Sequence, residues 1–228
     1  VAISIPVLFA FTQSYPEIKI TILTKKQFTP LFRDITTARI ISADFDKKHK
    51  GFFGLYELSR QIRKLNVDAV VDLHNVLRTN ILKHFLPGIE FFQIDKARSQ
   101  KKALINGSSF IALRTTTERY ADVFRSLGLS LELTAFDFTP SKQLMPATLK
   151  TLEGFTSAVI GIAPFAAYSS KTYPMSKMKM VIYELQKEYK VLLFGGGRQE
   201  SEFLAKLASK YKNVFSTAAK FSLEEELD

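Results

Sequence analysis

The sequence contains no cysteine and only three histidines, which excludes several kinds of functional site. Without cysteine the chain can hold no disulfide framework, no thiolate metal site and no cysteine nucleophile. His49, His74 and His84 lack a metal-ligand spacing such as H-E-x-x-H, so we expect no bound metal. The G-x-S-x-G turn that carries the nucleophile of α/β-hydrolases is also absent.

Long apolar runs are absent as well. Because no run approaches the roughly 18 residues of a membrane-spanning helix, we expect no transmembrane segment. The opening residues VAISIPVLFAF have neither the basic leader nor the small-residue cleavage site of a signal peptide. They do not begin with methionine either, which is consistent with a trimmed amino terminus.

Positive charge exceeds negative charge by ten, and most of the excess lies in the first two thirds of the chain. Residues 1–155 carry 22 Lys and Arg against 14 Asp and Glu, whereas residues 156–228 carry 10 against 8. A basic surface of this kind can meet nucleic acid, an anionic membrane or a phosphorylated ligand. It also occurs in proteins that bind none of these, where it serves solubility.

The spacing of apolar residues alternates between strands and helices, as in a doubly wound α/β sheet. A polar stretch over residues 139–154 is the best candidate for a linker, and a second series of strands and helices starts at Val159. Near the end of the chain, Ser222 and Glu225 form the S-x-x-E pattern that opens a helix. The predicted strands cover residues 18–23, 67–73, 89–94, 131–138, 159–163 and 191–194. The predicted helices cover residues 4–13, 55–65, 76–86, 116–127, a segment from Ser176, and 200–209.

The loops after the first two strands of the second series have compositions that suit an anionic ligand. The first contains Ser170 and Lys171, whose hydroxyl and ammonium groups can bind phosphate oxygens. The second contains Gly195, Gly196 and Gly197, which let backbone amides approach a ligand closely. Because such loops lie where open α/β sheets bind ligands, the pair favours a nucleotide or nucleotide-sugar site. On the residues alone, a solvated lysine and a plain tight turn explain the two loops as well.

A basic segment and a strand end in the first part of the chain are further candidates. Asp72 and His74 end a predicted strand, although a lone histidine in this position is more often structural than catalytic. Four cations in seven residues follow the predicted strand 89–94, namely Lys96, Arg98, Lys101 and Lys102. They could contact a phosphorylated acceptor or anionic lipid head groups, and a solvated basic loop fits them equally well. No aromatic residue is interleaved with them, which weakens a single-stranded nucleic-acid site.

Four local patterns resemble glycosyltransferase family 9, the ADP-heptose:lipopolysaccharide heptosyltransferases. Residues 5–32 resemble the family's opening helix and second strand, and residues 67–82 resemble its D-x-x-x-D-L-Q strand with the following helix. Residues 94–104 resemble the segment that the family places after a G-F-D motif. Residues 169–185 and 191–208 resemble its T-K-x-W-P and GG-x-x-E motifs. The patterns cover nearly the whole chain in the family's order.

The resemblance implies an α/β fold of the GT-B type, with two Rossmann-like doubly wound domains facing across a cleft. Residues 1–155 would form an acceptor-binding domain that lacks its first strand, and residues 156–228 would form part of the donor-binding domain. The family's catalytic aspartate lies in a G-D pair just before Val1, and its D-[ST]-G-x-x-H donor motif lies beyond Asp228. We therefore expect no catalytic residue in these 228 residues and no activity from them alone, within a parent protein that is a glycosyltransferase.

Residues that match the family's motifs receive roles from the resemblance. Lys171 matches the lysine that binds donor phosphate, and Glu200 matches the acidic residue beside the nucleoside. Tyr173 replaces the family's usual Trp, and Asn75 stands where the family often has Gly. The expected donor-binding residues are Ser170, Lys171, Gly195, Gly196, Gly197 and Glu200, and the expected acceptor-binding residues are Lys96, Arg98 and Lys101.

The implied reaction is metal-independent, inverting transfer of heptose or a related sugar. The donor would be a nucleotide-sugar such as ADP-heptose, no cofactor is expected, and the acceptor would be a lipid-linked lipopolysaccharide core or similar glycan. The resemblance places the protein in the cytoplasm, with peripheral contact to the anionic inner membrane as an option and no nucleic-acid partner. A non-catalytic module that holds a nucleotide or phosphosugar is the alternative, followed by nucleic-acid binding driven by the positive charge.

Overall fold

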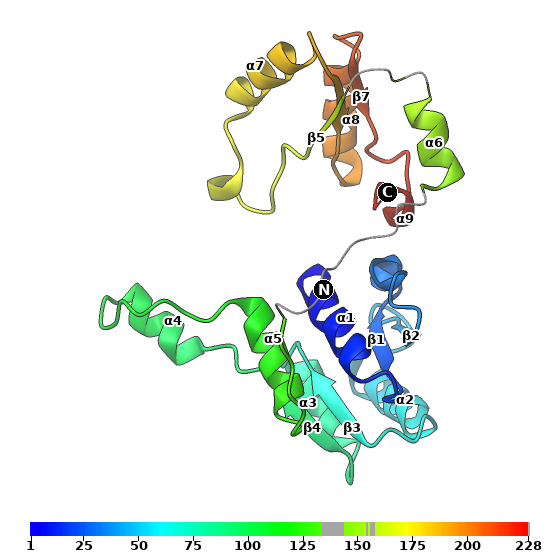
Figure 1. Ribbon diagram of the computed structural model, residues 1–228, viewed down its shortest axis with the longest axis vertical. Helices are drawn as coiled ribbons and strands as arrows, with labels where there is room; N and C mark the ends of the chain where they lie inside the picture. The colour runs from blue at the N-terminus through cyan, green and yellow to red at the C-terminus, as the bar shows by residue number, and fades with distance from the viewer. Residues whose placement is uncertain (134–143, 154, 156–157, 228) are drawn as a thin grey trace. The chain divides into compact units, whose positions relative to one another are not determined.

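The computed structural model describes residues 1–133, 144–153, 155 and 158–227, and the chain divides into two compact units (Figure 1). The first unit comprises Val1–Pro140 and the second Ser141–Asp228. Every pair of hydrogen-bonded strands in the described part of the chain is parallel. Parallel strands need a crossover between them, so this pairing confirms the α/β class that the alternating pattern predicts.

The strands of the first unit form two parallel pairs. β1 (Thr21–Lys25) pairs with β2 (Arg39–Ala43), and β3 (Ala69–Asp72) pairs with β4 (Glu90–Gln93). The carboxyl ends of β3 and β4 are level, because Asp72 lies opposite Gln93. The helical elements of this unit are η1 (Ala2–Ser4), α1 (Ile5–Ser14), η2 (Lys26–Phe32), α2 (Gly51–Arg63), α3 (Leu77–His84), α4 (Arg98–Ile105) and α5 (Thr116–Arg125).

Two hydrophobic clusters hold the first unit together. The larger cluster centres on α1, where Phe11 is buried with its ring centroid 4.6 Å from that of Phe124 on α5. Ile22 of β1 lies in the same cluster, so the helices α1 and α5 are packed together with a strand. The smaller cluster joins β2 to α2 and α3 through Ala43, Leu58, Leu82 and Leu86. Burial of this apolar surface supplies the main favourable free energy of folding for the unit.

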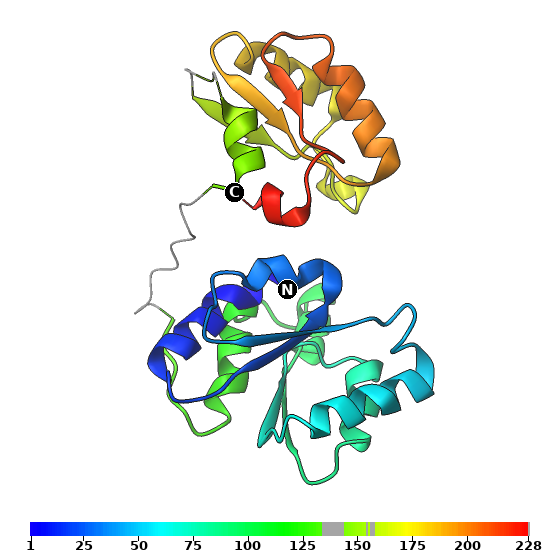
Figure 2. The same cartoon turned by 90° about the vertical axis from the view of Figure 1, so that its right-hand side faces the viewer.

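The second unit is built on one parallel sheet of three strands. β5 (Val159–Ile162) and β7 (Val214–Ser216) lie on either side of β6 (Lys190–Leu193), and Figure 2 shows the three strands side by side. The helical elements of this unit are α6 (Pro146–Leu152), η3 (Ser169–Lys171), α7 (Met175–Leu185), α8 (Gly197–Ala208) and α9 (Leu223–Glu226). The core lies where α7 and α8 meet the sheet, and its most deeply buried residues are Ile182, Val191, Leu193 and Leu204.

The two units divide between Pro140 and Ser141, whereas the sequence predicts domains of residues 1–155 and 156–228. The difference arises from α6, which lies within the stretch 139–154 that was expected to be a linker. Pro146 starts this helix, and proline is tolerated in a first helical turn because the amide that it lacks has no partner there. The Thr148 hydroxyl donates to the carbonyl of Glu225 (3.4 Å), which ties α6 to the second unit.

Other elements differ from the predictions in detail. β2 was not predicted at all, because a five-residue run with two isoleucines is a weak strand signal. The predicted strand 131–138 lies outside the described residues from 134 onward, and residues 131–133 are not in a strand. α8 begins at Gly197, three residues before the predicted start, and α7 begins at Met175 with Pro174 as its N-cap. The predicted S-x-x-E capping box at the start of α9 is confirmed.

Candidate functional site

The carboxyl ends of the three strands in the second unit lie at one level. Ile162, Leu193 and Ser216 are neighbours in the sheet register, so the loops after β5, β6 and β7 leave the same edge side by side. The amide of Phe194 donates to the carbonyl of Ile162 (2.9 Å), and the amide of Thr217 donates to that of Leu193 (3.0 Å). Ligands of open α/β sheets bind at this edge, so the predicted donor loops meet where such a site is built.

The loop after β6 requires glycine for reasons that differ between its positions. A Cβ atom on Gly195 would lie 2.7 Å from Cδ1 of Leu204 and 3.2 Å from Oε2 of Glu200, so this residue is a close-packing glycine. Gly197 has φ +72°, a left-handed conformation that side chains disfavour. Gly196 has open space around its Cβ position. The loop is therefore a tight turn and, at Gly196, leaves room for an approaching ligand.

Glu200 holds this loop closed. Its carboxylate oxygen Oε2 accepts a hydrogen bond from the amide of Gly196 (2.8 Å), across one turn of α8. The first amides of a helix have no partner within the helix, and the helix dipole makes this end attractive to anions. A diphosphate can therefore bind at the start of α8, on amides beyond the one that Glu200 uses. The carboxylate contributes a negative charge beside that position and favours hydroxyl groups, which can donate to it.

Lys171 lies on the loop after β5, in the short helix η3. Its side chain is exposed, and its Nζ lies 5.6 Å from the centroid of the Tyr168 ring. The amide of Lys171 donates to the Tyr168 carbonyl, and the Thr172 hydroxyl donates to the same carbonyl (3.2 Å). Ser170 is exposed next to Lys171. The loop is thus folded by its own backbone, and its cation is exposed to solvent.

The third strand contributes two residues that the sequence analysis missed. The Thr217 hydroxyl is buried and donates to the Leu193 carbonyl (3.1 Å), which links the ends of β6 and β7. Ser216 is also buried, and its hydroxyl has no hydrogen-bond partner among the described residues. The run Val214–Ser216 is a usable signal, because a β-branched and an aromatic residue together favour a strand.

In the first unit, Asp72 organises the carboxyl ends of β3 and β4. Its carboxylate accepts hydrogen bonds from the amides of His74 (2.9 Å) and Asn75 (2.8 Å) and from the side-chain amide of Gln93 (3.0 Å). Burial raises the pKa of Asp72, but hydrogen bonds from Thr79, Gln93 and the two backbone amides outweigh it, so the pKa lies below its ordinary value. Asp72 is therefore an ionised structural cap for the turn that follows β3.

The residues around Asp72 support this structural role. Asn75 has φ +41°, in the left-handed region that Asn tolerates better than most side chains. Its side-chain amide donates to the carbonyl of Ile94 (2.9 Å). His74 is exposed and takes part in the turn through its backbone amide.

The predicted acceptor residues lie on and just before α4. Arg98 and Lys101 are exposed on the helix, whereas Lys96 is half-buried before it and its carbonyl accepts a hydrogen bond from Arg119 (3.3 Å). A cavity of about 650 Å³ lies beside α4, and Gln93 and Gln100 contribute polar groups to its lining. The structure thus places the predicted donor and acceptor residues in different units, each at or after the carboxyl end of a parallel strand.

Among the described residues, no three His, Cys, Asp or Glu side chains gather as metal ligands. Within the same residues, no helix has both the length and the apolar character needed to span a membrane.

Comparison with known proteins decides the family. The family model of glycosyltransferase family 9 (heptosyltransferase) matches residues 55–228, which is most of the chain. The chain belongs to glycosyltransferase family 9. The matched residues include Asp72, the basic helix α4 and both loops of the second unit. The assignment made from four local patterns is thereby confirmed, and so is the prediction of a glycosyltransferase.

Solved family 9 structures share the fold. A glycosyl transferase family 9 structure from Veillonella parvula DSM 2008 matches with a TM-score of 0.75 and 18% identity, over 98% of this chain and 67% of that one. The structure of E. coli heptosyltransferase WaaC with ADP matches with a TM-score of 0.62 and 18% identity, over 98% of this chain and 72% of that one. The structure of E. coli ADP-heptose lps heptosyltransferase II matches with a TM-score of 0.67 and 15% identity, over 99% of this chain and 71% of that one. These likenesses confirm the predicted GT-B type of α/β fold. A search of curated proteins found no match.

Proposed function

We propose that this family 9 chain binds a nucleotide-sugar donor, such as ADP-heptose, for transfer of the sugar to a lipopolysaccharide core or similar glycan. The observation that carries the proposal is the level edge of the second unit, where the Lys171 loop and the glycine loop leave neighbouring strands. Similar structures were solved with ADP and with ADP-2-deoxy-2-fluoro heptose, which supports a donor of this class. We further propose that transfer inverts the sugar carbon and uses neither metal nor cofactor.

The chemistry of the leaving group explains why these residues suit the reaction. Charge develops on the oxygens of the nucleoside diphosphate as its bond to the sugar breaks. The ammonium group of Lys171 and the first amides of α8 would stabilise that charge more in the transition state than in the bound donor. The Glu200 carboxylate would accept hydrogen bonds from ribose hydroxyls. Ser170 would add a hydroxyl donor beside the phosphates, and we assign the general base to no residue of this chain.

The acceptor side of the proposal rests on the first unit. The exposed surface of α4 carries Arg98 and Lys101, and Lys96 lies just before the helix, next to the cavity-lining Ala97. These three cations can meet acidic groups of an acceptor glycan. Because a lipid-linked acceptor is held in a membrane, we propose a cytoplasmic protein with peripheral contact to the inner membrane. The net charge of +10 suits an anionic acceptor and an anionic membrane surface.

Calorimetric titration of the chain with ADP tests the donor site. Lys171→Ala is expected to weaken ADP binding by about 1.5–3 kcal/mol, roughly tenfold to a hundredfold, because a charge-assisted hydrogen bond to phosphate is lost. Lys210→Ala is the matched control, since Lys210 is an exposed lysine between α8 and β7, at the opposite edge of the same sheet. Equal ADP affinity for Lys171→Ala and the unchanged chain would remove Lys171 from the site.

A further inference from the structure

The segment of residues 96–114 in the first unit, here called the basic arm, has an unusual distribution of charge. It contains five Lys and Arg residues and no Asp or Glu. Its helix α4 has no buried residue, and Figure 1 shows α4 set apart from the strands of the first unit. Lys101 and Lys102 lie three and four residues after Arg98, so these cations share one side of the helix. Gln100 and Ala103, on the other face, line the 650 Å³ cavity.

The tip of the basic arm is apolar. Ile105 ends α4 and is 88% exposed, and after the turn Phe110 and Ile111 are 86% and 77% exposed. The amides of Ser108 and Ser109 both donate to the carbonyl of Ala103, so the chain folds back on the end of α4. Ile105, Phe110 and Ile111 thus lie close together in the sequence, at the end of α4 and just after the turn, and Ile111 also lines the 650 Å³ cavity. Single exposed apolar residues are ordinary, whereas several in one short segment beside cations indicate an interaction surface.

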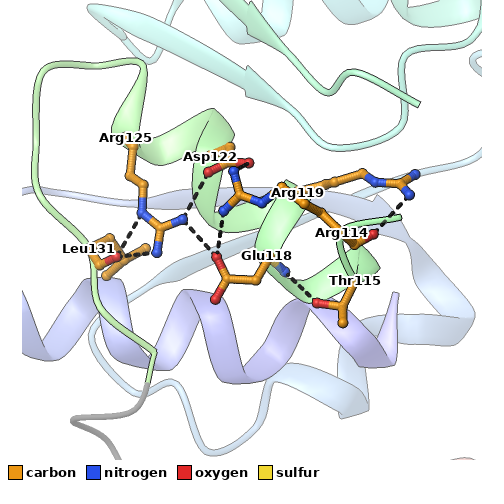
Figure 3. A network of polar contacts seen from close by, with 7 residues as sticks. All are labelled: Arg114, Thr115, Glu118, Arg119, Asp122, Arg125 and Leu131. Carbon is orange, nitrogen blue, oxygen red and sulfur yellow. Dashed lines mark hydrogen bonds and ion pairs between the residues drawn. The ribbon is translucent and has the colours of Figure 1, made fainter. Parts of the chain in front are cut away.

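Both ends of the basic arm are hydrogen-bonded to α5, so the folded first unit holds the arm in its exposed position. Arg119 donates from one guanidinium to both ends of the arm, to the carbonyls of Lys96 (3.3 Å) and Arg114 (2.8 Å). Arg114 pairs in turn with Glu118 (3.0 Å) and Asp122 (2.6 Å). Figure 3 shows Arg114, Glu118, Arg119 and Asp122 of this network.

The other end of α5 is fixed in the same network. Arg125 pairs with Glu118 and Asp122 (both 2.8 Å) and donates to the carbonyl of Leu131 (2.6 Å and 2.8 Å). Two arginines thus share two carboxylates along one helix. The hydrogen bond to Arg125 is the largest contribution that lowers the pKa of Glu118, so this carboxylate stays ionised to a lower pH than an unpaired glutamate. The basic arm is therefore attached to α5, whose two ends are fixed by these ion pairs.

We propose that the basic arm docks on an anionic membrane surface, with Ile105, Phe110 and Ile111 inserted at the boundary between headgroups and acyl chains. Lys102, the exposed cation of α4 that has no proposed role in acceptor binding, would then lie on lipid phosphates. This inference rests on the proposed function, because it gives the peripheral membrane contact a definite site. Charge complementarity selects the occupant: the arm carries no acidic residue, and cations followed by an apolar tip match a layer of anionic headgroups over hydrocarbon.

Flotation with lipid vesicles tests the proposal. The chain is expected to bind vesicles of phosphatidylcholine mixed with phosphatidylglycerol more strongly than vesicles of phosphatidylcholine alone, and salt should weaken the binding. The triple variant Ile105→Ser/Phe110→Ser/Ile111→Ser should bind mixed vesicles at least about tenfold more weakly, since apolar burial supplies part of the affinity. Lys102→Gln should bind them about fivefold more weakly, because one cation near the surface is lost.

Phe53→Ser is the matched control, because Phe53 on α2 is 85% exposed but lies outside the arm. It should leave vesicle binding unchanged. The proposal is overturned if the chain does not bind mixed vesicles, if the triple variant and Lys102→Gln both bind like the unchanged chain, or if Phe53→Ser weakens binding as much as the triple variant. The vesicles contain neither nucleotide-sugar nor glycan. Failure here therefore leaves the ADP titration unaffected, and failure of that titration leaves the vesicle result standing.

Discussion

Replacing Gly195 by alanine is expected to destabilise the second unit by about 1–3 kcal/mol, because the new methyl group overpacks a filled core. The added Cβ would lie 2.7 Å from Cδ1 of Leu204 and 3.2 Å from Oε2 of Glu200. Leu204 is fully buried and cannot turn away without disturbing its neighbours. Movement of Glu200 would instead break its hydrogen bond to Gly196 and loosen the start of α8.

The neighbouring glycines provide matched controls. A Cβ on Gly196 meets no atom within 4 Å, so Gly196→Ala should change stability by no more than about 0.5 kcal/mol. Gly197→Ala should cost about 1–2 kcal/mol, because its φ of +72° strains a residue with a Cβ. We therefore expect Gly196→Ala to lower stability least of the three glycine variants.

Urea unfolding followed by circular dichroism measures these losses, since the chain has no tryptophan to report by fluorescence. Two units need not unfold together, so hydrogen exchange in β6 should report the second unit separately. Equal losses for Gly195→Ala and Gly196→Ala would refute the close packing of the loop against Leu204.

Three further predictions concern the first unit. Gly54→Ala should unfold or strongly destabilise it, since a Cβ there would clash with the backbone of His49; normal thermal unfolding of this variant would contradict that packing. The low pKa of Asp72 stabilises the fold above about pH 4, so urea midpoints should fall below that pH, and Asp72→Asn should reduce this dependence. Glu118, whose pKa is also lowered, keeps part of it, and an unchanged pH profile in Asp72→Asn would contradict the contribution of Asp72. Burial lowers the pKa of His49, so as the pH falls the imidazole takes up a proton in the unfolded chain before it does so in the folded one. The urea midpoint should therefore also fall as the pH drops below about 6.5. A midpoint that stays constant through this pH range would contradict the lowered pKa of His49.

Local patterns predict most of the elements because they depend on neighbours in the sequence. Pro6 near the start of α1 and the capping box of α9 are examples, since both act within one helical turn. The family follows from motifs that are also local. α6 was missed because the prolines and polar residues of its region indicate a linker, although Pro146 is also compatible with a helix start.

The packing of the site could not be read from the sequence in the same way. The glycine run leaves a turn and a ligand loop equally open, and only the position of Leu204 shows why Gly195 must be glycine. The bond between Glu200 and the Gly196 amide depends on where α8 begins, which the periodicity places three residues too late. The exposed apolar residues of the basic arm were not predicted, because Ile105 and Phe110 are residue types that are usually buried in a core. Whether such a residue is buried depends on its contacts in the folded unit, which the local sequence does not show.

We propose that the carboxyl edge of the second unit's sheet binds the diphosphate of a nucleotide-sugar. Hydrogen exchange of the chain with and without ADP is the most direct test of this site. We expect ADP to slow exchange at the amides of residues 195–199, at the start of α8, and of residues 169–172, around Lys171. Unchanged exchange at both loops under saturating ADP, or protection confined to the first unit, would contradict it.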